Sequence, residues 1–160
     1  MIQSVKPAPT DETDGLPMPK RIWAVISVGF ALCMSVLDVN IINIVLPTLS
    51  HDFGTSPAVT TWIINGYQLA IVVSLLSFSA LGEIIGYRKV YLSGIGLFCI
   101  TSLICALSDS FWTLTIARIF QGFSASAITS VNTAQLRYIY PKSQLGRGMG
   151  INAMVVAISA

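Results

Sequence analysis

Charged residues are scarce in this 160-residue sequence and make up 10% of it, whereas an average soluble domain is about 25% charged. Apolar residues make up 54%, which leaves too little polar surface to cover a soluble domain of this size. The same hydrophobicity excludes a disordered chain, which needs low hydrophobicity and high charge. The net charge of +2 is too small to indicate a nucleic-acid partner. The composition therefore predicts an integral membrane protein whose surroundings are the lipid bilayer.

Residue types that carry chemistry are also few. The three cysteines lie in apolar runs without metal-site or disulfide-framework spacing, and we interpret them as small buried hydrophobic residues. The one histidine, His51, stands beside Asp52 in an expected loop and is interpreted as solvated. No phosphate-binding loop, metal-ligand set or nucleophile with its base is visible. The sequence therefore predicts no enzyme activity, catalytic residue, metal or cofactor.

Long apolar runs divide the chain into expected membrane spans of about 20 residues. Residues 1–21 are polar and are predicted to form a disordered cytoplasmic tail. The rest, 22–160, is predicted to form a partial all-α transmembrane bundle. Its four complete spans are expected at 22–49, 60–82, 90–108 and 111–134. A fifth run, 148–160, is too short to cross a hydrocarbon core about 30 Å thick, so we expect a fragment or a truncated product.

The positions of Lys and Arg predict which way the spans point. Three of these cations precede the first span, two lie in 83–89 and three lie in 135–147, whereas 50–59 and 108–110 have none. Cytoplasmic loops carry an excess of Lys and Arg. We therefore expect a multi-pass protein of the cell membrane with a cytoplasmic N-terminus. In a bacterium this would be the cytoplasmic, or inner, membrane.

Two charges, Asp38 and Arg118, lie inside the predicted spans. A charge near the bilayer centre costs a few kcal/mol, so such a residue is a candidate for function. Asp38 lies about ten residues from the outer end of its span and Arg118 about seven into its own, which places both in the outer half at similar depth. They could pair or face the same wet cavity. The alternative is an ion pair that only holds two helices together.

Polar and small side chains near these charges are candidates for lining a cavity. On the fourth span they follow Arg118 at three- and four-residue steps, which places them on one helix face. The small residues among them could equally be helix contacts. On the second span, Tyr67 could be a membrane-interface anchor or a cavity wall. The candidates are Asn65, Tyr67, Gln68, Gln121 and Gly122.

Three segments, in order, resemble signatures of the major facilitator superfamily. LGEIIGYRK at 81–89 resembles the loop between the second and third helices, G-x-L-[AG]-D-[RK]-x-G-[RK]-[RK]. LTIARIFQG at 114–122 resembles the fourth-helix signature l-x-x-x-R-x-x-q-G. LDVNIINIVLP at 37–47 is similar to the first-helix signature L-D-x-T-I-V-N-V-A-L-P of the fourteen-span drug:proton antiporters. Together the resemblance covers about residues 20–160.

The sequence departs from these signatures at four positions. Ser79 replaces the first loop glycine, Glu83 replaces the aspartate, Ile84 replaces a basic residue and Asn40 replaces a threonine. The fifth-helix antiporter signature would lie beyond Ala160, so antiport is implied by the first-helix motif alone.

The resemblance implies the N-terminal part of a proton-driven exporter of hydrophobic or cationic small molecules, a multidrug efflux transporter. Such a transporter rocks two halves around a central site, so its partners would be substrate, protons and a missing C-terminal half. Asp38 would take up a proton or meet a cationic substrate, and Arg118 would be its electrostatic counterpart. A cytoplasmic gating loop would comprise Gly82, Glu83, Gly86, Arg88 and Lys89.

Two other functions remain open from the sequence. The first is a major facilitator importer or symporter of a small solute, which shares the loop and fourth-helix signatures. The second is a small membrane protein that transports nothing and assembles with a partner.

Overall fold

The computed structural model describes residues 15–159, and these form helices without a strand. The elements are α1 Met18–Asp52, α2 Pro57–Ile85, α3 Tyr87–Ala106, α4 Phe111–Ile139, the 3-10 turn η1 Lys142–Gln144 and α5 Leu145–Ser159. The predicted all-α helix-bundle class is confirmed. Of the predicted tail, residues 1–14 lie outside the described residues, and α1 begins at Met18, inside the segment predicted to be disordered.

Proline and glycine set several of the helix boundaries. Pro17 is the N-cap residue of α1, and Pro57 is the first residue of α2, where the missing N–H is not needed. Ser56 accepts a hydrogen bond from the Val59 N–H at 3.4 Å and so caps α2. Gly86 ends α2 at a φ of +99°, a conformation that favours glycine, and α3 starts directly after it.

Three of the described helices, α1, α2 and α3, are long and apolar enough to cross a membrane. α4 has 29 residues but is less apolar, because it carries Arg118, Gln121, Asn132 and several hydroxyl side chains. Many of these polar side chains are buried against the other helices. Helix α4 therefore suits a position inside the bundle, away from lipid.

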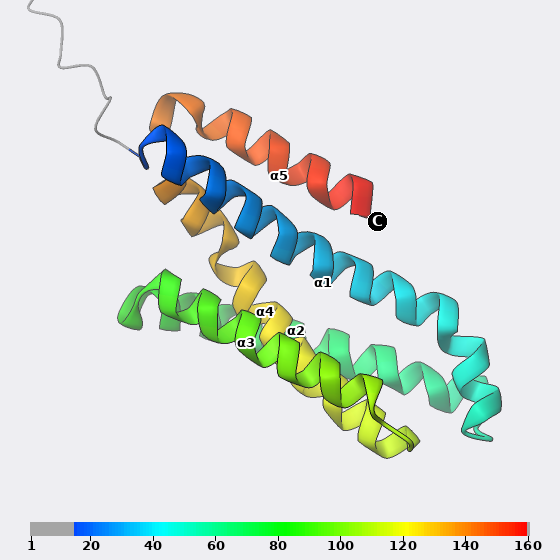
Figure 1. Cartoon of the computed structure of the whole chain (residues 1–160). Helices are drawn as coiled ribbons and strands as arrows, with labels where there is room; N and C mark the ends of the chain where they lie inside the picture. The colour runs from blue at the N-terminus through cyan, green and yellow to red at the C-terminus, as the bar shows by residue number, and fades with distance from the viewer. Residues whose placement is uncertain (1–14, 160) are drawn as a thin grey trace, which may run out of the picture.

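α4 crosses the centre of the bundle (Figure 1). It packs extensively on α2 and α3 and also contacts α1 and α5, while α1 and α5 lie side by side. α1 packs far less extensively on α2 and α4 than those two helices pack on each other. The core is built largely from α4 and includes Ala125, Ile128 and Val131. α1 is consequently joined to α4 partly through individual polar contacts.

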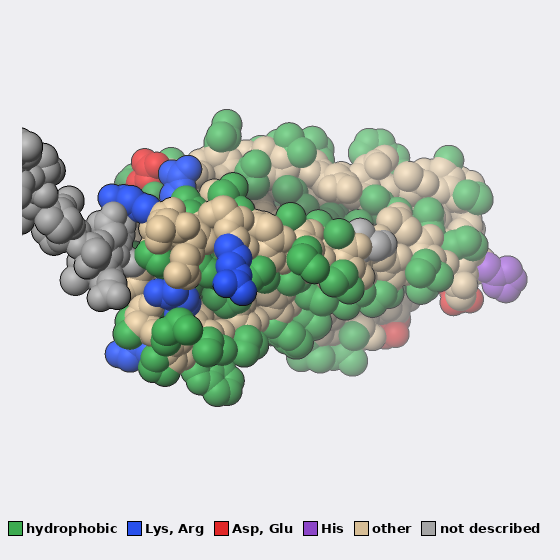
Figure 2. Space-filling model, turned by 90° about the horizontal axis from the view of Figure 1, so that it is seen from above, with side chains coloured by type: hydrophobic (Ala, Val, Ile, Leu, Met, Phe, Trp, Pro, Cys, Tyr) green, Lys and Arg blue, Asp and Glu red, His purple; other side chains and the backbone are tan. Residues whose placement is uncertain are grey.

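The two ends of the bundle differ in charge. Lys and Arg side chains gather at the end where the described chain begins, and His lies at the opposite end (Figure 2). Arg21 Nη1 donates to Gln144 Oε1 at 3.1 Å, and the Leu16 N–H donates to the Ile139 carbonyl at 3.2 Å, so the start of α1 is joined to the α4–α5 corner. The cations of the described residues, apart from Arg118, are Lys20, Arg21, Arg88, Lys89, Arg137, Lys142 and Arg147.

Candidate functional site

Asp38 on α1 and Arg118 on α4 form an ion pair inside the bundle. Arg118 Nη1 donates to Asp38 Oδ2 at 2.6 Å. The Arg118 side chain is only 7% exposed and the Asp38 side chain 16%. A charge-assisted hydrogen bond of this length in surroundings with little water is a strong electrostatic contact. Of the two arrangements that the sequence left open, direct pairing is the one observed.

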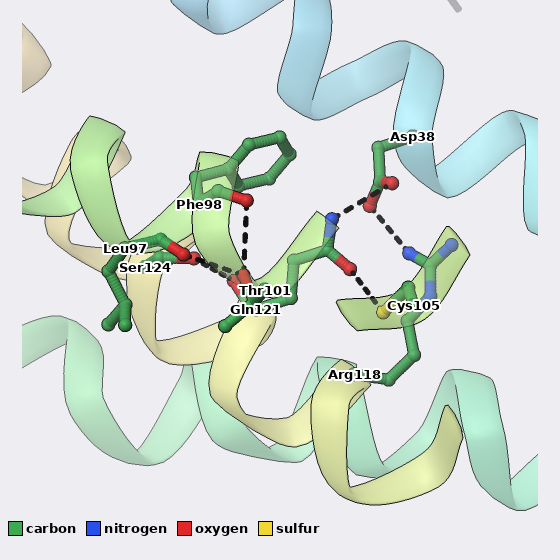
Figure 3. Close-up of polar contacts among 8 residues, drawn as sticks. All are labelled: Asp38, Leu97, Phe98, Thr101, Cys105, Arg118, Gln121 and Ser124. Atoms are coloured by element: carbon green, nitrogen blue, oxygen red, sulfur yellow. Dashed lines mark hydrogen bonds and ion pairs between the residues drawn. The ribbon is translucent and has the colours of Figure 1, made fainter. Parts of the chain in front are cut away.

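Gln121, on α4, is the second residue that binds the Asp38 carboxylate. Its Nε2 donates to Asp38 Oδ1 at 3.1 Å, so each carboxylate oxygen accepts one hydrogen bond from α4 (Figure 3). The Gln121 side chain is fully buried. Its Oε1 accepts a hydrogen bond from Cys105 Sγ of α3 at 3.4 Å. A chain of contacts thus runs from α3 through Gln121 to the ion pair.

Arg118 retains hydrogen-bonding capacity beyond this pair. Its Nε is buried and has no partner among residues 15–159. The Arg118 side chain also borders a cavity of about 10 Å³ between α1, α2 and α4, roughly the space of one water molecule. The cavity is lined by Val39, Ile42, Ile63, Ile64, Tyr67 and Arg118. A guanidinium with spare donors can change partners when the charge on Asp38 changes.

The other predicted cavity-lining residues fall into two groups. Tyr67 is buried and forms part of the cavity wall beside Arg118. Gly122 lies where α4 crosses α2, and a Cβ added there would be 2.5 Å from the Tyr67 carbonyl oxygen. Asn65 and Gln68 lie on an exposed part of α2. The structure therefore brings Tyr67 and Gln121 to the ion pair and packs Gly122 against the backbone of α2. Asn65 and Gln68 face outward from the described bundle.

The predicted gating loop lies at the α2–α3 junction, at the other end of α2 from Tyr67. Gly82 is buried, and a Cβ there would be 2.7 Å from the Tyr87 ring. Glu83, Arg88 and Lys89 are exposed. The two glycines, Gly82 and the positive-φ Gly86, allow a tight turn that presents these charges at the end of the bundle.

Two contacts between helices were not predicted from the sequence. Cys105 was interpreted as a buried apolar residue, yet it contacts the Gln121 amide. Asn132 Nδ2 donates to Asn152 Oδ1 at 3.3 Å and joins α4 to α5. Among residues 15–159 there is also no group of three or more His, Cys, Asp or Glu side chains that could hold a metal ion. The candidate site of the described residues is the Asp38–Arg118 ion pair, with the Gln121 amide hydrogen-bonded to the same carboxylate.

Comparison with known families agrees with the signatures and the helical fold. The model of the Major Facilitator Superfamily matches residues 28–160. The chain belongs to this superfamily. The match includes the helices that supply Asp38, Arg118 and Gln121, so the ion pair lies within the family's own fold.

Individual relatives are transporters of several kinds. The chain is 51% identical over 152 residues to the uncharacterized transporter YebQ of Escherichia coli K12, covering 95% of the chain and 33% of the relative. It is 32% identical over 140 residues to the riboflavin transporter RibZ of Clostridioides difficile, covering 87% and 31%. It is 32% identical over 155 residues to the tetracenomycin C resistance and export protein of Streptomyces glaucescens, covering 96% and 29%. The chain spans about a third of the length of these relatives.

Proposed function

We propose that this chain forms the N-terminal part of a major facilitator transporter that exports hydrophobic or cationic small molecules in exchange for protons. The observation that carries the proposal is the buried Asp38–Arg118 pair with Gln121 on the second carboxylate oxygen. A second half of the transporter, not represented in this chain, would complete the substrate site.

Proton coupling follows from what the pair does when Asp38 binds a proton. The neutral carboxyl group no longer attracts Arg118, whose free donors can then bind elsewhere. The pair joins α1 to α4, and α1 packs lightly on its neighbours. Losing the pair therefore shifts the balance between two positions of α1. Protonation at this one residue is in this way converted into a movement of a helix beside the central site.

The substrate class is supported by polar residues and by relatives. Asn65 and Gln68 are exposed in an apolar span, where contact with lipid is unfavourable, so we place them on a wet cavity shared with the second half. One relative carries the name of an export protein for tetracenomycin C, and another that of a drug efflux pump, JefA of Mycobacterium tuberculosis. These relatives favour export of drug-like molecules.

The riboflavin transporter among the relatives supports a second candidate, transport of a small nutrient. The two candidates differ in direction and in substrate. Everted vesicles that contain the full-length transporter should accumulate a cationic dye when the lumen is acidified, and a protonophore should abolish the accumulation. Uptake of riboflavin without dye transport would favour the second candidate. Dye accumulation that persists with the protonophore would contradict the exchange for protons.

The Lys and Arg side chains at one end of the bundle predict the orientation of the chain in the membrane. We expect the N-terminus in the cytoplasm and the α1–α2 connection outside. In a background with the native cysteines replaced by serine, a membrane-impermeant maleimide applied to intact cells should label His51→Cys and spare Ser4→Cys. His51 suits this purpose because its side chain is 92% exposed. The reverse labelling pattern would contradict the proposed topology.

The 160-residue chain by itself is expected to show no transport. A central site in this superfamily lies between two halves, and this chain spans about a third of its relatives. Liposomes that contain only this chain should therefore retain a trapped dye at the leak rate of empty liposomes. Substrate efflux that saturates with concentration would show instead that the chain, or an assembly of its copies, is a complete transporter.

A further inference from the structure

The orientation of the Gln121 amide is dictated by its neighbours. A carboxylate can only accept hydrogen bonds, so Gln121 must present its NH₂ group to Asp38. Its Oε1 then points to the opposite side of the amide. Because the side chain is fully buried, that oxygen needs a donor from the protein, and a buried acceptor without one is costly.

Cys105 supplies this donor from α3. Its Sγ lies 3.4 Å from Gln121 Oε1 (Figure 3). The nearby hydroxyl groups are already used in bonds to the backbone. Thr101 donates to the Leu97 carbonyl at 2.8 Å, and Ser124 donates to the Gln121 carbonyl at 2.6 Å. The thiol is therefore the side-chain donor that meets the amide oxygen.

We propose that Cys105 is a positioning residue for the proton-coupling site and holds Gln121 in the orientation that binds Asp38. The inference rests on the proposed function for its effect on transport, while the contact itself can be tested without transport. Without the thiol donor, the Gln121 amide can rotate until its Oε1 meets another hydrogen-bond donor. Asp38 Oδ1 then loses its hydrogen bond from Nε2. Cys105 in this way connects α3 to a pair formed by α1 and α4.

Thiol alkylation tests the contact in the 160-residue chain in liposomes. A thiol that donates to Gln121 must break that bond to react, so Gln121→Leu should raise the rate of alkylation of Cys105 by N-ethylmaleimide roughly two- to fivefold. Gln121→Glu can hold the same geometry when it is protonated, as expected for a carboxyl group buried against the Asp38 carboxylate. Its O–H then donates to Asp38 and its carbonyl oxygen accepts from Cys105, so the rate should stay near that of the unmodified chain. Cys99, exposed on the same helix, is the internal reference and should react equally in all variants.

Two alkylation results would overturn the contact. One is an unchanged Cys105 rate in Gln121→Leu. The other is an equal rise in Gln121→Leu and Gln121→Glu, because that would show easier access of the reagent without any role for the acceptor.

Transport by the full-length protein tests the positioning role. Cys105→Ala should lower proton-driven export roughly two- to fivefold, and Cys105→Ser, which keeps a donor, should restore most of it. Cys105→Ala should add nothing to the defect of Gln121→Leu, because the two residues act through one contact. Cys99→Ala is the matched control and should export normally. Equal losses in Cys105→Ala and Cys105→Ser, or no loss in either, would overturn the role.

The two proposals fail in distinguishable ways. Normal export by Asp38→Asn would remove the proposed function, whereas the alkylation rates would still report the Cys105–Gln121 contact. Loss of export in Asp38→Asn together with an unchanged alkylation rate in Gln121→Leu would leave the proposed function in place and remove only the role of Cys105.

Discussion

Replacing Asp38 by Asn in the full-length transporter is expected to reduce proton-driven export to background, while the protein still inserts in the membrane. Asn has nearly the same shape but cannot ionise, so the exchange of a proton at this position is lost. The measurement is dye accumulation in everted vesicles under an imposed pH gradient, normalised to the amount of protein. We expect at least a tenfold loss, because Asp38 is the one carboxylate of residues 15–159 that lies away from the helix ends, where a charge is costly and marks function.

The matched control is Asp109→Asn, which makes the same substitution at an exposed residue between α3 and α4. It should export at the normal rate. Movement of substrate down its own concentration gradient should persist in Asp38→Asn, since downhill transport needs no proton. Uphill export by Asp38→Asn at the normal rate would show that the Asp38–Arg118 pair is a structural ion pair, and the proposed mechanism would be wrong.

Asp38→Asn should fold because the proposed cycle already passes through a neutral residue at this position. Asn can still accept a hydrogen bond from Gln121 or Arg118 through its amide oxygen. Arg118 keeps its charge without a counter-ion, which is unfavourable in a buried setting. The spare donors of the guanidinium and the adjacent cavity give it room to rearrange. The variant therefore resembles the protonated state of the pair.

The helices could be predicted from the sequence because lipid demands long apolar runs. Their ends could not, because charges mark the limit of the hydrocarbon core while the hydrogen-bonded helix continues past it. α1 accordingly begins at Met18, although its span was expected from residue 22, and α4 continues to Ile139, although its span was expected to end at 134. Pro57 and Gly86, which alter the backbone itself, coincide with real boundaries.

The depth of the charged residues could likewise be estimated from the rise per residue of a helix, and it brought Asp38 and Arg118 to similar levels. Which neighbours meet them depends on how the helices are rotated and packed. The sequence therefore placed Asn65, Tyr67 and Gln68 together, yet in the structure only Tyr67 turns inward. Cys105 lies in an apolar run, and nothing in its sequence context indicates the amide that it meets across the helix interface.

Gly122→Ala is expected to destabilise the folded bundle by about 1–3 kcal/mol, the usual cost of an extra methyl group in a packed core. The added Cβ would lie 2.5 Å from the Tyr67 carbonyl oxygen and 2.9 Å from the Ala70 Cβ. The oxygen belongs to the backbone of α2, so it cannot move aside like the end of a flexible side chain. α4 and α2 must separate instead. A lower thermal-unfolding midpoint in detergent measures this effect.

Gly96→Ala is the matched control, since Gly96 also lies within a helix but a Cβ there meets nothing within 4 Å. Replacing a helical glycine by alanine favours the helix by up to about 1 kcal/mol, so Gly96→Ala should leave the midpoint unchanged or raise it. The same gain acts at Gly122 and is outweighed there by the clash.

Because Gln121 is the adjacent residue on α4, moving α4 away from α2 also displaces the amide that binds Asp38. Gly122→Ala should therefore lower export as well as stability. Equal midpoints for Gly122→Ala and Gly96→Ala would show that the α2–α4 crossing tolerates a methyl group and does not fix the position of Gln121.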